Sequence, residues 1–273
     1  MRAVLETSAP QDRWNRYGAE RISDMRAHPE RYLLTEAPEH AQEVYRDLLE
    51  VLGSFRGCQV LEMGSGFGQL SVFLACQGVT VTGVDVGTDL VAAARLLAQF
   101  NGAACTFHQC SVVEMPFPPH SFDAVIGASI LHHLSESDLT KALQEAHRVL
   151  KDGGVAVFYE PVENSRVFDL LQNLVPVGRR GSPDYRPSIL QRRAWRAYIR
   201  ASDDRALTNR ELIRTGRHFR AVRIEPHDGP LRRLDRVIGE RYWPALMGID
   251  RFILRTFPPV RFLSRTVRVE YLK

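Results

Sequence analysis

The spacing of apolar residues changes twice along the chain, and each change predicts a different kind of element. Residues 11–55 are helical in pattern, most clearly over 38–52. Short β-branched or apolar runs then alternate with helical segments, which predicts strands at 58–63, 79–85, 103–108, 122–129 and 155–159. After a loop-rich and helical stretch, the pattern predicts a strand at 218–225, two amphipathic helices within 231–262 and a last strand at 266–272.

The alternation of strands and helices predicts an α/β fold with a doubly wound, mostly parallel sheet of seven strands. Residues 1–56 are expected to form an N-terminal helical lid and residues 57–160 the core. Residues 161–273 are expected to supply a substrate cap, the last strands and an amphipathic helical insertion, in one continuous domain with the core. Ser135 is expected to cap the helix that begins there, because a serine side chain satisfies free backbone amides.

Charge divides the chain into two unlike parts. Residues 1–160 carry 12 Lys and Arg against 20 Asp and Glu, a net charge of −8, whereas residues 161–273 carry 24 against 12, a net charge of +12. A basic half attracts nucleic acid, anionic lipid or an anionic substrate. The alternative interpretation is that these arginines form ion pairs with the acidic half of the chain or lie solvated on helices.

Cysteine usage and hydropathy narrow the class of protein. The four cysteines form no CxxC pair and give neither a disulfide scaffold nor zinc-ligand spacing, so no metal site is expected. No run of about 18 apolar residues occurs, and the first residues lack the apolar region of a signal peptide. These features predict a cytoplasmic protein, soluble or bound peripherally to a membrane.

Candidate chemistry begins at the turn after the first predicted core strand. Gly64, Gly66 and Gly68 form a GxGxG turn between that strand and a helix, where glycine lets the backbone approach a ligand closely. Ligands of open α/β sheets bind at the carboxyl ends of the strands, where this turn lies. A dinucleotide fingerprint requires a third glycine where Gln69 stands, which argues against NAD.

Two carboxylates indicate which ligand is expected instead. Asp85 ends the second strand, where a carboxylate can hold ribose hydroxyls, and Glu62 precedes the first glycine. Glu62 would repel a pyrophosphate but favour a cationic ligand. Together these residues favour S-adenosylmethionine (SAM), which carries ammonium and sulfonium groups.

Residues 58–160 resemble the class I, seven-strand SAM-dependent methyltransferases, which have a Rossmann-like sheet. The resemblance rests on segments 60–68, 81–85, 114–123 and 150–154. It implies that the three glycines line the methionine and ribose of SAM, that Asp85 and its neighbour Val86 lie at the ribose, and that S-adenosylhomocysteine is the product. The remaining positions that it places at the donor are Ser111 and Val112 at the adenine, where the family often has Asp in place of Ser111, and Gly127 and Ala128, whose carbonyls would face the methionine ammonium.

Candidate catalytic residues follow the fourth and fifth strands. His132 and His133 lie after one strand and Glu160 ends its neighbour, so a His–carboxylate base is expected on the ligand side. The arrangement resembles that of sugar O-methyltransferases in natural-product pathways. Alternatively, one histidine packs against or caps the following helix. Tyr17 and Tyr32 are aromatic candidates for a lid over the donor.

These features predict a SAM-dependent methyltransferase acting on a small molecule, most readily at a hydroxyl. The alternatives are a methyltransferase-fold cyclase or isomerase that uses SAM as scaffold, and a lipid- or membrane-associated methyltransferase. The acceptor would be hydrophobic, or anionic if the arginines at 179–196 bind it. Nucleic acid is not favoured as a partner, because the fourth strand does not end in an Asn/Asp-Pro-Pro-Tyr type loop. Residues 231–263 would pack within the fold, form a homodimer seam or touch an anionic membrane.

Overall fold

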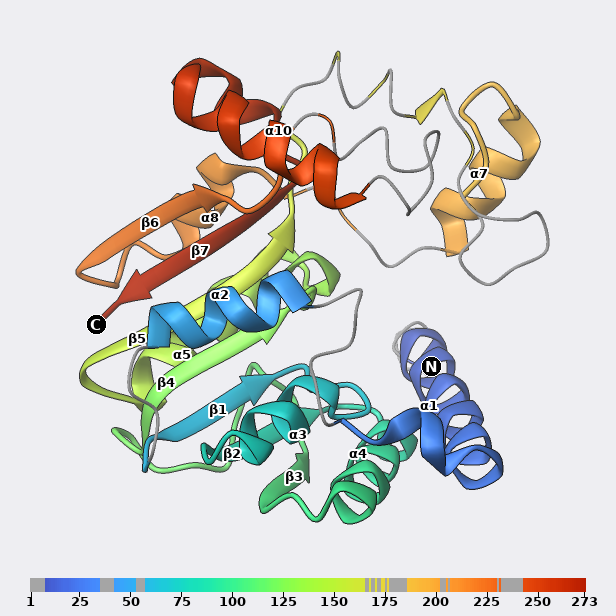
Figure 1. Cartoon of the computed structure of the whole chain (residues 1–273), viewed down its shortest axis with the longest axis vertical. Coiled ribbons are helices and arrows are strands. Elements are labelled where there is room, and N and C mark those ends of the chain that lie inside the picture. Colours follow the sequence, from blue (N-terminus) through green and yellow to red (C-terminus); the bar gives the residue numbers. More distant parts are fainter. Residues whose placement is uncertain are drawn as a thin grey trace.

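The computed structural model describes residues 8–34, 42–52, 57–164, 186–201, 207–229 and 243–273, together with residues 167, 170, 173, 174, 176, 205 and 231. Its centre is a seven-stranded sheet in the order β3-β2-β1-β4-β5-β7-β6 (Figure 1). The strands are β1 Gln59–Met63, β2 Thr80–Asp85, β3 Cys105–Gln109, β4 Phe122–Ala128, β5 Leu150–Pro161, β6 Ala221–Pro226 and β7 Thr266–Leu272. Only β7 runs antiparallel to its neighbours β5 and β6, so the predicted mostly parallel sheet is confirmed.

Helices cover both faces of the sheet. The helices are α1 Ser8–Ala27, α2 Gln42–Leu52, α3 Gln69–Cys76, α4 Thr88–Asn101, α5 Glu136–Val149, α7 Arg192–Ala201, α8 Asn209–Thr215 and α10 Trp243–Thr256, with short 3-10 helices η1 Pro29–Tyr32, η3 Leu131–His133 and η6 Pro258–Leu263. Side chains of α2 and α3 share one apolar cluster with β1, β2, β4 and β5. The cluster on the other face joins α5 and α8 to the sheet.

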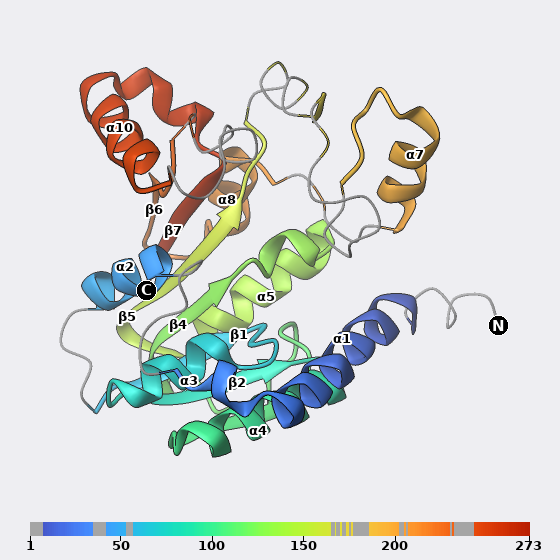
Figure 2. The same ribbon diagram turned by 45° about the vertical axis from the view of Figure 1, so that its right-hand side comes forward.

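Burial explains why these segments pack as they do. Leu48 of α2 and Leu74 of α3 are fully buried on one face, and Leu143 of α5 on the other. Each fully buried side chain of this size stabilises the fold by about 1.5–3 kcal/mol. Helix α1 lies across α4 at the β3 side of the molecule, and it buries Met25 there (Figure 2).

Two local features differ from the sequence pattern. The predicted turn at 151–154 lies inside β5, where Leu150 pairs with Phe122 and Val155 with Ala124, so that the four residues between them bulge outward. Strand β6 starts at Ala221 rather than at His218.

The predicted cap on α5 is confirmed, because the Ser135 side chain accepts a hydrogen bond from the Asp138 amide.

The C-terminal helices are described in part. Of the two amphipathic helices predicted within 231–262, the second is α10, and the first falls on residues outside the described ones apart from Leu231. Helix α10 buries Leu246 and Leu254 but leaves Phe252 65% exposed. No helix in the described part of the chain is long and apolar enough to cross a membrane.

Candidate functional site

The glycine turn has the geometry that the sequence predicts. Gly64, Gly66 and Gly68 have φ values of +69°, +53° and +85°, in the left-handed region that side chains rarely adopt. A Cβ on Gly64 would lie 2.6 Å from the Ile130 side chain, whereas a Cβ on Gly66 would meet nothing within 4 Å. The turn thus leaves open space at Gly66, directly before α3.

Asp85 links this turn to the next loop. Its Oδ2 accepts a hydrogen bond from the Gly66 amide at 2.9 Å, and its Oδ1 accepts one from the Gly87 amide at 2.9 Å. Burial raises the pKa of Asp85, although the backbone hydrogen bonds act in the opposite direction. Each carboxylate oxygen keeps a lone pair for a further donor, such as a ribose hydroxyl.

A cavity of about 410 Å³ opens beside the glycine turn and Asp85, within the range typical of small-molecule sites. It is lined by Trp14, Tyr17, Gly64, Gly66, Asp85, Val86, Leu90, Ser111, Val112, Ser129, Ile130, His133 and Leu134. The residues come from α1, from α4, from the last position of β2 and from the segments that follow β1, β2, β3 and β4. The structure therefore brings together seven predicted site residues, namely Gly64, Gly66, Asp85, Val86, Ser111, Val112 and His133.

Four predicted donor-site residues lie outside this lining. Glu62 is 4% exposed and accepts a hydrogen bond from the Ser71 hydroxyl beneath the turn. Gly68 packs against α4, where a Cβ would lie 2.8 Å from that of Ala94. Gly127 and Ala128 also do not line the cavity, and a Cβ on Gly127 would lie 2.7 Å from the Phe158 ring. Close packing thus accounts for Gly68 and Gly127 without a ligand.

Glu62 has the most perturbed acidity near the turn. Burial, and to a smaller extent the charge of Asp85, raises the pKa of this carboxyl to about 8, although the hydrogen bonds from Ser71 act in the opposite direction. A cation bound at the turn would favour the ionised form of Glu62.

The predicted His–carboxylate pair exists in the structure, but it is buried. His132 Nδ1 lies 2.8 Å from Glu160 Oε2, and the two side chains are 9% and 0% exposed. Glu160 also accepts hydrogen bonds from the amides of Ile130 and Leu131 at 2.8 Å and of His132 at 3.3 Å. Glu160 therefore fixes the η3 turn as well as the ring of His132.

His133 is the histidine of the pair that lines the cavity. Its ring centroid lies 4.0 Å from that of His132 and 5.3 Å from that of Trp14, which meets it edge-on. Trp14 and Tyr17 lie on one side of α1, since residues three apart share a helix face. The predicted aromatic lid residue Tyr17 thus lines the cavity, while Tyr32 does not and instead donates a hydrogen bond to Asp24.

Sequence reasoning missed five cavity residues, which are Trp14, Leu90, Ser129, Ile130 and Leu134. Trp14 was detectable, because it lies three positions before Tyr17 on the same helix. Ser129 has φ +57°, an uncommon value for a serine, and no sequence signal marks it. No group of three His, Cys, Asp or Glu side chains placed to hold a metal occurs among the residues that the structure describes.

Comparisons with known proteins agree with this architecture. Residues 60–154 match the family described as "Methyltransferase domain". A ubiquinone biosynthesis O-methyltransferase of Pseudomonas syringae pathovar tomato is 30% identical over 141 residues, covering 49% of this chain and 59% of the relative. A protein of the same name from Paramagnetospirillum magneticum is 39% identical over 101 residues, covering 37% of this chain and 39% of the relative.

These alignments span only about half the length of the curated relatives. Among solved structures, the [4+2]-cyclase SpnF shares the fold with a TM-score of 0.54 and 19% identity, over 87% of this chain and 83% of the other. Over residues 60–154 the chain is thus similar to methyltransferase domains, and its seven-stranded, mostly parallel sheet with helices on both faces is the α/β methyltransferase fold.

Proposed function

We propose that the cavity binds SAM and that the protein transfers its methyl group to a hydroxyl of a hydrophobic small molecule. The observation that carries the proposal is the cavity itself, which joins Gly66, Asp85 and His133 in one space. The open side of Gly66 lets a ligand approach the backbone. Asp85 would hold the ribose hydroxyls, and Ser111 and the Val112 amide would face the adenine.

Bound SAM supplies an electrophilic methyl carbon: the acceptor oxygen forms a bond to that carbon while the C–S bonding pair stays on sulfur. A phenol has a pKa near 10, so it keeps its proton at neutral pH and needs a base. His133 lines the cavity and would take that proton on its imidazole. His132, oriented by Glu160, would hold the His133 ring from behind, because the two rings are in contact.

The walls favour an acceptor with an apolar or aromatic body. Trp14, Tyr17, Leu90, Ile130 and Leu134 line the same cavity as His133, and such side chains exclude water from the reacting atoms. The relatives named as ubiquinone biosynthesis O-methyltransferases support a hydroxyl as the atom methylated. The alternative is a cyclase or isomerase that uses SAM as scaffold and would release no S-adenosylhomocysteine. The [4+2]-cyclase SpnF shows that a cyclase can have this fold.

Exposed apolar side chains on helix α10, and directly after it, offer a surface at which a hydrophobic acceptor would reach the protein. Ile249, Phe252 and Phe257 are 49%, 65% and 56% exposed, and they belong to the half of the chain with a net charge of +12. Apolar side chains within a basic segment favour contact with an anionic lipid surface. A homodimer seam on the same residues is the competing outcome.

The first test is methyl transfer from radiolabelled SAM into an extract of the source cells, separated into organic-soluble, aqueous and macromolecular fractions. We expect methyl label in the organic fraction, together with an amount of S-adenosylhomocysteine equal to the amount of methyl group transferred. Label in the macromolecular fraction, with a steep loss at high salt, would contradict it in favour of a nucleic-acid acceptor.

A further inference from the structure

The turn that carries both histidines is held at two ends. Glu160 accepts hydrogen bonds from three amides at its start, and Arg205 donates to two carbonyls at its end. The Arg205 amide donates to the His132 carbonyl at 3.0 Å, and its Nε donates to the Leu134 carbonyl. Carbonyls at the end of a helical turn have no partner within the turn, so Arg205 completes the hydrogen bonding that keeps η3 in place.

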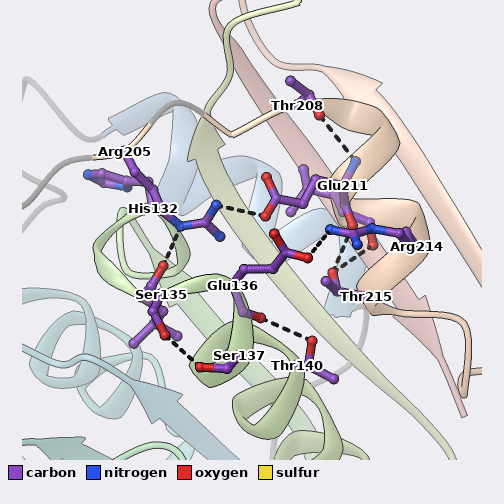
Figure 3. Close-up of polar contacts among 12 residues, drawn as sticks. His132, Ser135, Glu136, Ser137, Thr140, Arg205, Thr208, Glu211, Arg214 and Thr215 are labelled. Carbon is purple, nitrogen blue, oxygen red and sulfur yellow. Dashed lines mark hydrogen bonds and ion pairs between the residues drawn. The ribbon is translucent and has the colours of Figure 1, made fainter.

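Arg205 is itself fixed by a largely buried partner. Its Nη1 lies 2.7 Å from Glu211 Oε1, and the two side chains are 28% and 13% exposed. Glu211 lies in the first turn of α8, where its amide donates to the Thr208 side chain at 3.2 Å. Figure 3 shows this arrangement, with Arg205 lying between His132 and Glu211. A guanidinium that donates from two nitrogens in fixed directions holds both groups at once.

The same segment also runs along the end of β5. The Glu163 amide donates to the Leu207 carbonyl at 2.8 Å, and the Asn209 amide donates to the Asn164 side chain at 2.9 Å. These contacts begin three residues after Glu160. The two ends of the histidine turn are therefore held by segments that are hydrogen-bonded to each other.

We propose that Arg205 is a positioning residue for the His132–His133 turn, with Glu211 as its anchor. It lies outside the lining of the cavity, and it acts by holding the backbone from which His133 enters that cavity. The inference rests on the proposed function, because it assigns Arg205 to the placement of the proposed base. It also links that base to the region between β5 and β6, where we expect the acceptor to be recognised.

A readout that needs no acceptor tests the placement. The five amides of residues 130–134 donate either to Glu160 or to carbonyls within the turn, so their hydrogen–deuterium exchange reports the stability of the turn. Arg205→Met is expected to speed exchange across 130–134 by about fivefold to tenfold, the effect of one lost hydrogen bond. Arg205→Lys should restore part of the protection. Arg214→Met is the matched control, since the Arg214–Glu136 pair is 2.8 Å long but more than half exposed.

A kinetic cycle tests whether the placement serves the base. With an alkyl-catechol as the probe acceptor, Arg205→Met should lower kcat about 10- to 100-fold, with the Kd for SAM changed less than about twofold. In a His133→Ala background the same substitution should cost less than about twofold, because residues that act as a unit are not additive.

The outcomes separate the two proposals. No methyl transfer by the wild-type protein, together with faster exchange in Arg205→Met, would refute the proposed function on this acceptor class and retain the holding role of Arg205. Unchanged exchange in Arg205→Met would overturn the inference. An equal loss of kcat with His133 present and in the His133→Ala background would also overturn it, as would a loss of SAM affinity that parallels the loss of kcat.

Discussion

A pair of glycine substitutions tests whether the turn after β1 holds the donor. Gly66 and Gly102 have similar left-handed conformations, with φ values of +53° and +58°, and a Cβ on either would meet no atom within 4 Å. Alanine at each should therefore cost a similar amount of unfolding free energy, about 1–2 kcal/mol. Gly66 lines the cavity, whereas Gly102 ends α4 away from it.

The two variants should differ in SAM binding. A methyl group forced into a close backbone–ligand contact costs about 1–3 kcal/mol, which raises Kd about 5- to 150-fold. Calorimetric titration with SAM would measure Kd, and thermal unfolding would show that both variants fold. We expect weaker binding in Gly66→Ala alone. Equal SAM affinity in Gly66→Ala and Gly102→Ala, with both folded, would refute the placement of SAM on this turn.

Three further predictions concern pH and surface contact. The carboxyl of Glu62 ionises near pH 4.5 in the unfolded chain, whereas its pKa is about 8 in the folded protein. The free energy of unfolding should therefore fall as pH rises from about 4.5 to 8, by at most about 5 kcal/mol for this group. In urea unfolding over the same pH range, Glu62→Gln should show a smaller fall in the free energy of unfolding than the wild type. Burial would raise the pKa of Asp47, but the nearby His227 and the hydrogen bonds from Tyr159 and Arg268 lower it to about 2. The stability that ionised Asp47 contributes should therefore be lost as pH falls from about 3.8 to 2. At neutral pH, Asp47→Asn should lower the free energy of unfolding in urea by about 1–3 kcal/mol. The wild-type protein should sediment with anionic vesicles, and Phe252→Glu should abolish this sedimentation. If the wild type binds no vesicles but forms a dimer, and Phe252→Glu breaks that dimer, the exposed apolar residues form a seam between two copies instead.

Much of the fold follows from local sequence signals. The strands of the core are short apolar or β-branched runs, and the helix at Ser135 has a capping side chain that sequence alone identifies. The extent of β5 over 150–161 was not predictable, because Gly153 and Gly154 signal a turn. Only the pairing of Leu150 with β4, and of residues 155–161 with β4 and β7, places both sides of the four-residue bulge in one strand.

The site was predictable where residues follow strand ends. Gly64, Gly66 and Asp85 line the cavity because parallel strands bring their carboxyl ends to one edge of the sheet. The spacing of three places Trp14 on the same side of α1 as Tyr17, but the packing of α1 on α4 that brings both to the cavity is a long-range contact that no spacing encodes. Arg205 contacts the histidine turn from a segment 71 residues away from Leu134 in sequence, which likewise depends on tertiary structure.

The stoichiometry of the reaction with purified protein, methyl-labelled SAM and an alkyl-catechol tests most directly whether the protein is a methyltransferase with His133 as its base. We expect one S-adenosylhomocysteine per methylated acceptor, with kcat reduced at least about 100-fold in His133→Ala and SAM binding retained. Conversion of the acceptor without consumption of SAM, or full activity in His133→Ala, would contradict it.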